Sequence, residues 1–231
     1  MEHIQYYLIK ASVKLAQEFG PCEYFDKTKY SKGILPIDTY CKNVDELVKR
    51  EYSLDWESLR ADILKYGMRN STLTAIMPAE SSAVVTNATN GIEPPRALVS
   101  IKKSKQGLLK QVVPDIARLK NKYTLAYDMK SNKGIISLQA VMQKWVDQAI
   151  SSNQYYDIVK YPNKEIPTSI LAQELLYAYK MGLKTLYYAN TNDDKTDDYS
   201  EQIKSSLQEG IVNAEMALMD DSGCESGACS I

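Results

Sequence analysis

Residues 69–96 read RNSTLTAIMPAESSAVVTNATNGIEPPR, and this stretch decides the fold. Its segment STLTAIM (71–77) is rich in β-branched and apolar residues and ends at Pro78, which predicts a short buried strand. Ser81 and Ser82 then stand where a helix or turn begins. Free backbone N–H groups at such a point, with serine hydroxyls beside them, suit an anion such as phosphate. Serines also cap helices without binding a ligand, so capping is the alternative.

The rest of the chain alternates predicted helices with predicted strands. Helical spacing of apolar residues and terminal glycines predict helices at residues 2–19, 54–66, 115–129, 136–151, 167–180 and about 200–218. Alternating apolar and polar positions predict a half-exposed strand at residues 94–104, and residues 184–190 (KTLYYAN) are a further strand candidate. This alternation favours an α/β fold. These few strands cannot close a barrel and would leave open sheet edges. We therefore expect the chain to form half of a larger structure.

The composition excludes several classes of protein. The 231 residues include 28 basic and 29 acidic side chains, a net charge of −1 that does not indicate a nucleic-acid or membrane surface. No apolar run approaches the ~20 residues of a membrane span, and the N-terminus does not resemble a signal peptide. The sequence therefore predicts a cytoplasmic protein with reduced thiols. Its single histidine, His3, argues against Ser-His-Asp hydrolysis and a His-built zinc site, and we expect no metal on this chain.

Tyr187 and Tyr188 are the first pair of residues that could carry chemistry. Neighbours on a strand point to opposite faces, so an aromatic pair in a buried sheet is unremarkable. The functional alternative is redox chemistry. Closely placed phenols that are shielded from water can pass a hydrogen atom when their O–H groups align.

The cysteines form a second candidate. Cys224 and Cys229 lie in DDSGCESGACSI (220–231), a polar, glycine-rich stretch typical of a mobile tail. The segment can bend enough to form a reversible disulfide, and exposure allows thiol exchange. A metal-binding or inert tail is the alternative, but two thiols without histidine are too few ligands. Cys22 and Cys41 are predicted to be half-buried structural thiols.

Together these segments resemble one family, the large catalytic subunit of class I ribonucleotide reductase, over its C-terminal third. The match covers Glu2 to Ile231 and is carried by the segment 69–96 and by KGILPIDTY (32–40), KQVVPD (110–115), YKMGLKTLYYANT (179–191) and the two-cysteine terminus. The family fold is a ten-stranded α/β barrel made of two five-stranded halves. The resemblance implies that residues 1–218 belong to the second half of that barrel. Residues 219–231 would form a flexible redox-active tail.

The resemblance also implies roles for individual residues. The turn that holds the substrate's diphosphate in the family corresponds to Pro78, Ala79, Glu80, Ser81 and Ser82. Tyr187 and Tyr188 correspond to stacked tyrosines that relay a radical by hydrogen-atom transfer to an active-site cysteine. Cys224 and Cys229 correspond to thiols that re-reduce the active-site disulfide and are then reduced by thioredoxin or glutaredoxin.

The implied function is reduction of ribonucleoside diphosphates to deoxyribonucleoside diphosphates for DNA synthesis. The family's radical-bearing cysteine precedes the matched segments, and no cysteine of this chain corresponds to it. We therefore expect an N-terminal large-subunit partner, with the chain being a naturally split subunit or an expressed fragment. The radical would come from a small subunit with a di-metal centre, and this chain would bind no cofactor itself. The alternative is a non-catalytic remnant or binding module that holds phosphate or the small subunit.

Overall fold

The computed structural model describes residues 1–48, 51–104 and 107–192, which belong to two compact units. Unit 1 comprises Met1–Pro78, Lys130–Gln154 and Glu165–Asn190. Of the described residues, unit 2 comprises Ala79–Met129, Tyr155–Lys164 and the pair Thr191 and Asn192. The predicted helix at about 200–218 and the predicted tail at 219–231 lie outside the described residues.

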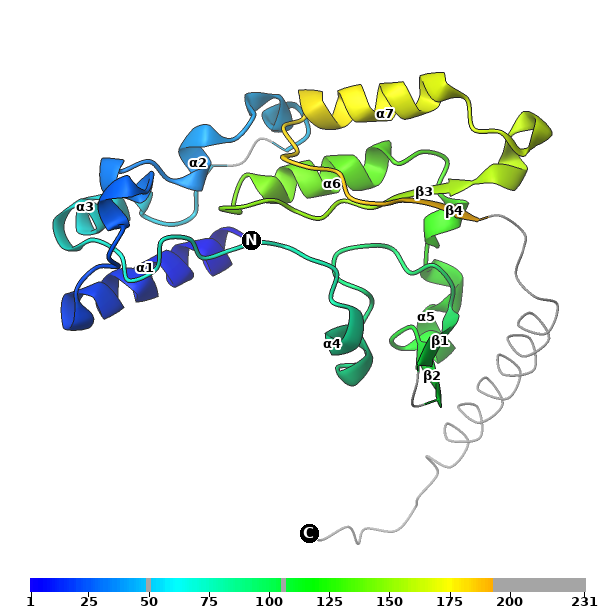
Figure 1. Cartoon of the computed structure of the whole chain (residues 1–231), viewed down its shortest axis with the longest axis horizontal. Helices are drawn as coiled ribbons and strands as arrows, with labels where there is room; N and C mark the ends of the chain where they lie inside the picture. Colours follow the sequence, from blue (N-terminus) through cyan, green and yellow to red (C-terminus); the bar gives the residue numbers. More distant parts are fainter. Residues whose placement is uncertain (49–50, 105–106, 193–231) are drawn as a thin grey trace, which may run out of the picture. The chain divides into compact units, whose positions relative to one another are not determined.

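The main core of unit 1 lies between helices α1 (Glu2–Phe19) and α3 (Trp56–Tyr66), drawn blue and cyan in Figure 1. One apolar face of each helix is buried, with Ile9 and Ile63 completely inaccessible to solvent. The carboxylate of Glu2 accepts hydrogen bonds from the Ser53 N–H (2.8 Å) and the indole N–H of Trp56 (3.2 Å). The prediction of both helices is confirmed.

The connection between these two helices consists of short helical turns. They are η1 (Phe25–Lys27), η2 (Tyr30–Lys32), α2 (Pro36–Thr39) and η3 (Lys42–Glu46). Asp55 caps α3 as predicted, because its carboxylate accepts the Ser58 N–H at 3.0 Å. Gly67 ends α3 with a φ of +74°, and a Cβ there would lie 2.8 Å from the Cβ of Pro21. Only glycine fits this turn without displacing a neighbour.

Helices α6 (Lys133–Gln143) and α7 (Thr168–Lys180) run side by side in unit 1, and Figure 1 draws them in green and yellow. Glu174 of α7 is buried, and its carboxylate accepts hydrogen bonds at the start of α6. The donors are the hydroxyl of Ser131 (3.0 Å) and the backbone and side-chain N–H groups of Asn132 (both 2.9 Å). A negative charge is favourable at a helix N-terminus, so this contact joins the two helices.

Two predicted elements of unit 1 differ from the structure for a shared reason. The helix predicted at 136–151 ends at Gln143, because the following residues pair with the segment predicted as a strand at 71–77. Gln148 N–H donates to the carbonyl of Thr74 (3.0 Å), and Ile76 N–H donates to that of Ala149 (3.2 Å). Only one parallel bridge forms, between Ile76 and Ile150. Residues 71–77 are therefore extended but form no regular strand.

Unit 2 contains the antiparallel hairpin of β1 (Val99–Ser104) and β2 (Gly107–Val112), preceded by helix α4 (Glu80–Val85). The strand predicted at 94–104 begins only at Val99, because Pro94 and Pro95 have no N–H to donate to a ladder. Strand β2 was not predicted, since its apolar residues do not alternate.

The predicted helix at 115–129 was wrong over most of its length. The structure has α5 (Ile116–Leu119), η4 (Lys120–Lys122) and η5 (Ala126–Asp128) instead. Tyr123 is extended, and its hydroxyl donates to the carbonyl of Pro114 at 2.8 Å. The chain therefore folds back before a longer helix can form.

The remaining strands are β3 (Gln154–Asp157) and β4 (Ala189–Asn192), which pair with each other. Two short helical turns, η6 (Ile158–Lys160) and η7 (Pro162–Lys164), follow β3. The strand predicted at 184–190 begins only at Ala189. Helices and short strands confirm the mixed character of the fold. In the described residues the strands form two two-stranded sheets and no closed sheet.

Candidate functional site

Tyr187 and Tyr188 lie just before β4, with ring centroids 4.1 Å apart and ring planes inclined at 56°. The pair is therefore close, as a redox role requires. The rings do not point to opposite faces, so the expectation from a regular strand was wrong. Shielding from water, which the redox alternative requires, is absent within the described residues, where Tyr187 and Tyr188 are 52% and 59% exposed.

The backbone of this pair is held by three consecutive residues, Ser152, Asn153 and Gln154, all of them buried. Tyr187 N–H donates to the carbonyl of Ser152 (2.8 Å), and Gln154 N–H donates to the carbonyl of Tyr188 (2.9 Å). The Tyr188 N–H donates to the side-chain oxygen of Asn153 (3.1 Å). Sequence reasoning missed all three residues, because a short polar run between two elements is typical of an ordinary loop.

Lys184 anchors the beginning of the same segment. Its ammonium donates to the carbonyls of Val146 (3.3 Å), Asp147 (2.7 Å) and Gln148 (3.2 Å). Burial lowers the pKa of Lys184, while the nearby Asp147 carboxylate raises it in part. Residues 184–188 are therefore attached at both ends to the chain between residues 146 and 154.

Asp147 also organises the extended segment that leads to Pro78. Its carboxylate accepts the N–H groups of Leu73 (2.8 Å) and Thr74 (3.3 Å) and the hydroxyl of Tyr30. Gln5 closes the network by accepting from the Thr74 hydroxyl (2.7 Å) and donating to the Tyr30 hydroxyl (3.2 Å). Burial raises the pKa of Tyr30, and the Asp147 charge raises it further. Tyr30 therefore stays a neutral donor.

The turn predicted to hold phosphate spans the end of one unit and the start of the next. Pro78 is the last residue of this part of unit 1, and Ala79 precedes the six-residue helix α4 in unit 2. The Ser82 N–H donates to the Ala79 carbonyl (2.9 Å), and the Ser82 side chain is exposed. A helix does begin where the sequence predicted one. The side chains of Glu80 and Ser81 lie outside the described part of the structure.

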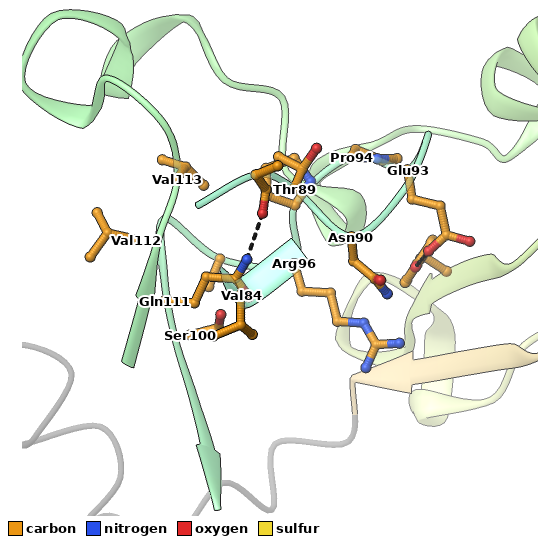
Figure 2. Close-up of a pocket in the computed structure, with 14 residues that line it drawn as sticks. Val84, Thr89, Asn90, Glu93, Pro94, Arg96, Ser100, Gln111, Val112 and Val113 are labelled. Atoms are coloured by element: carbon orange, nitrogen blue, oxygen red, sulfur yellow. Dashed lines mark hydrogen bonds between the residues drawn. The ribbon is translucent and has the colours of Figure 1, made fainter. Parts of the chain in front are cut away.

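A pocket of about 260 Å³ lies in unit 2 beside the NATNGIEPPR run (Figure 2). Figure 2 shows Glu93, Asn90 and Arg96 on one side and the apolar Val112 and Val113 on the other. The dashed line marks the bond that Gln111 donates to the carbonyl of Ala88, 2.5 Å long. Sequence reasoning used this run only as a family signature and assigned no pocket to it.

The buried carboxylate of Glu93 gives this pocket its polar wall. It accepts the hydroxyl of Tyr155, another buried residue, and the Arg96 guanidinium carbon lies 5.6 Å from the Tyr155 ring centroid. Burial raises the pKa of Tyr155, and the bond to Glu93 raises it further. Tyr155 therefore remains protonated at neutral pH and donates to the carboxylate.

The cysteines are only partly described. Cys22 and Cys41 are free thiols of intermediate burial, as predicted. Cys224 and Cys229 lie outside the described residues. In residues 1–48, 51–104 and 107–192, no three His, Cys, Asp or Glu side chains gather into a group able to hold a metal ion. None of the helices in these ranges has the length and apolar character needed to cross a membrane.

Comparisons with known proteins all indicate the same family. Residues 1–189 match the family described as ribonucleotide reductase, barrel domain. The chain is 53% identical over 230 residues to the ribonucleoside-diphosphate reductase subunit alpha of Buchnera aphidicola subsp. Baizongia pistaciae. It is 49% identical over 230 residues to ribonucleoside-diphosphate reductase 1 subunit alpha of Escherichia coli. The subunit alpha of Enterobacteria phage T4 is 48% identical over 201 residues, 86% of this chain.

These matches cover all or most of this chain but only a small share of each relative. The alignments with the two bacterial subunits include 100% of this chain but only 28% of either relative, and the phage alignment includes 27% of its relative. The chain thus spans little more than a quarter of the curated relatives it matches. The family match extends over most of the chain and agrees with the relatives. The chain therefore belongs to the ribonucleotide reductase family and corresponds to part of the barrel domain of the class I alpha subunit.

Proposed function

We propose that this chain forms part of an enzyme that reduces ribonucleoside diphosphates to deoxyribonucleoside diphosphates. Family membership supports this reaction, and so does the presence of the tyrosine pair and both tail cysteines in one chain. The rest of the large subunit would supply the radical-bearing cysteine. A small subunit with a di-metal centre would supply the radical.

The single observation that carries the proposal is the 4.1 Å separation of the Tyr187 and Tyr188 rings. We infer that they relay the radical. In this step the O–H hydrogen atom of one tyrosine moves to the phenoxyl oxygen of the other. One O–H bond breaks as the other forms, and the unpaired electron moves in the opposite direction. Ring proximity favours this transfer because it keeps the two phenols close to each other.

Pro78, Ala79, Glu80, Ser81 and Ser82 are proposed to hold the substrate's diphosphate. The support is the resemblance of this segment to the family's phosphate-binding turn. The contacts that Asp147 makes with Leu73 and Thr74 add to it, because they fix the chain just before the turn. Cys224 and Cys229 are proposed to carry electrons from thioredoxin or glutaredoxin to the active-site disulfide by thiol exchange.

The first test replaces Tyr188 with phenylalanine in the reductase assembled from this chain, the remaining large-subunit residues and the small subunit. Tyr188→Phe keeps the ring but removes the hydroxyl. We expect deoxynucleotide formation to fall to background, with binding of the nucleoside diphosphate unchanged. Tyr179→Phe is the matched control, because Tyr179 is 83% exposed on α7 and has no proposed part in the relay. This control should retain full turnover.

Full turnover in Tyr188→Phe would contradict the relay. An assembled complex that binds substrate but forms no deoxynucleotide, even with the unchanged chain, would favour the alternative of a non-catalytic binding module.

A further inference from the structure

We propose that Asn153 is a positioning residue that places the Tyr187 and Tyr188 rings side by side. This inference rests on the proposed relay function of the two tyrosines. Asn153 is 3% exposed and lies next to the completely buried Ser152. Its side-chain oxygen accepts the backbone N–H of Tyr188, so the proposed effect on the rings acts through the backbone.

The need for such a residue follows from strand geometry. In a regular strand, successive side chains point to opposite faces, which separates neighbouring rings. Ring centroids 4.1 Å apart are incompatible with that arrangement. The backbone at residues 187–188 must therefore depart from a regular strand, and β4 indeed begins only at Ala189.

The hydrogen bonds show what the departure is. In a regular parallel ladder, one residue would donate its N–H to Ser152 and accept the Gln154 N–H with its own carbonyl. Here Tyr187 donates to Ser152, but Tyr188 accepts from Gln154. Two tyrosines thus stand opposite the single residue Asn153. This two-against-one count is that of a β-bulge, which redirects side chains and leaves one residue without its ladder partner.

The Asn153 side chain supplies the missing partner. The Tyr188 N–H, which the bulge takes out of the ladder, donates to the Asn153 side-chain oxygen at 3.1 Å. This hydrogen bond is partly buried, and a backbone N–H that loses its acceptor in such a place costs free energy. Removing this oxygen should therefore favour a regular register, in which the Tyr188 ring turns away from Tyr187. The carboxamide stabilises the bulge, and the bulge brings the rings together.

The experiment distinguishes the effect of the hydrogen-bond acceptor at position 153 from the effect of side-chain volume. Asn153→Leu keeps a similar volume without an acceptor, whereas Asn153→Asp keeps an oxygen that can accept the Tyr188 N–H. Asn132→Leu is the control, because Asn132 is another buried asparagine of unit 1 that binds Glu174 instead. Each variant carries a fluorotyrosine at position 188 only. The ¹⁹F resonance of this residue depends on the neighbouring Tyr187 ring. Tyr187→Leu removes that ring and should move the resonance, which verifies the probe.

We expect Asn153→Leu to move the ¹⁹F resonance of the full chain and to lower kcat of the assembled reductase by roughly 100-fold, the loss that a misplacement of about 1 Å can cause. KM for the nucleotide should not change. Asn153→Asp should keep the resonance and kcat of the unchanged chain, and Asn132→Leu should keep its resonance. If Asn153→Leu does not fold, Asn153→Ala replaces it with the same expectations.

An unmoved resonance in the variant without an acceptor would overturn the proposal, and so would an equal shift in Asn132→Leu. Failure of the relay itself gives a different pattern. In that case Tyr188→Phe retains turnover, while the ¹⁹F measurement still reports whether Asn153 positions the ring.

Discussion

Asp38 shows how a single residue can connect two elements. Its carboxylate accepts two hydrogen bonds from the Arg60 guanidinium (2.6 and 3.0 Å) and one from the Leu35 N–H (2.7 Å). These contacts join the start of α2 to the middle of α3. Burial alone would raise the pKa of Asp38, but the hydrogen bonds from Arg60 and Leu35 outweigh it, so the pKa is lowered.

This lowered pKa predicts a pH dependence of stability. Because the folded-state pKa lies below the unfolded value of about 4, the contribution of Asp38 is complete above that value and is lost as the pH falls through the folded-state pKa. Asp38→Asn should therefore cost about 1 kcal/mol near neutral pH, since a partly exposed pair is screened by solvent. The difference from the unchanged chain should shrink as the pH falls below the unfolded value. Urea unfolding at several pH values measures this. Asp62→Asn, at an exposed position of α3, is the control.

The residue scale also shows where sequence reasoning ends. Caps such as Asp55 and terminal glycines such as Gly67 were predictable, because their partners lie within a few positions in the sequence. Lys144 was not. Its ammonium is buried beside the rings of Tyr40 and Tyr52 and lies 3.6 Å from the Asp45 carboxylate. Such partners are distant in sequence, and no local pattern indicates them.

Among the elements, α6 and α7 depend on one buried charge. Glu174→Ala should leave the N–H groups of Asn132 without their acceptor and cost about 2–3 kcal/mol of unfolding free energy. Glu174→Gln should cost less, because an amide oxygen can still accept one of these bonds. Urea unfolding of the chain measures both effects. Glu165→Ala, at an exposed position before α7, is the control, and an equal loss there would show that the contact with α6 is unimportant.

Elements with strong local signals were predicted best. Helices α1, α3 and α7 have apolar faces at regular spacing and clear ends, so their bounds agreed closely with the predictions. The extended segments did not, because strand formation depends on partners elsewhere in the chain. The pairing of residues 74–76 with 148–151 both shortened α6 and limited the predicted strand to a single bridge.

At the scale of the whole molecule, two helices expose several large apolar side chains. On α1 these include Ile4 and Phe19, and on α7 they include Leu175 and Leu176. Exposed apolar groups of this size are typical of interaction surfaces. They accord with a chain that spans 28% of its bacterial relatives, while assembly with a separate N-terminal partner stays a prediction.

The tail thiols give a prediction for the assembled enzyme. Cys229→Ser should stop turnover driven by thioredoxin but spare turnover driven by a small dithiol, because only the protein reductant needs an exposed relay. Deoxynucleotide formation with each reductant measures the difference. Cys22→Ser, which alters a half-buried thiol, should affect neither rate. An equal loss with both reductants in Cys229→Ser would contradict the shuttle.

The family and the position of the tyrosine pair could be recognised from sequence, because short motifs carried them. The bulge at Asn153 could not, since it depends on two segments more than thirty positions apart.

The openness of the tyrosine pair has a consequence for the lifetime of an oxidised state. Each ring presents more than half of its surface to solvent in the described part of the chain. A phenoxyl formed there would meet water and dissolved reductants before it could hand on its oxidising equivalent. In the proposed relay, other protein would therefore have to enclose both rings before the oxidation reaches them, and that order of events would protect the radical from loss.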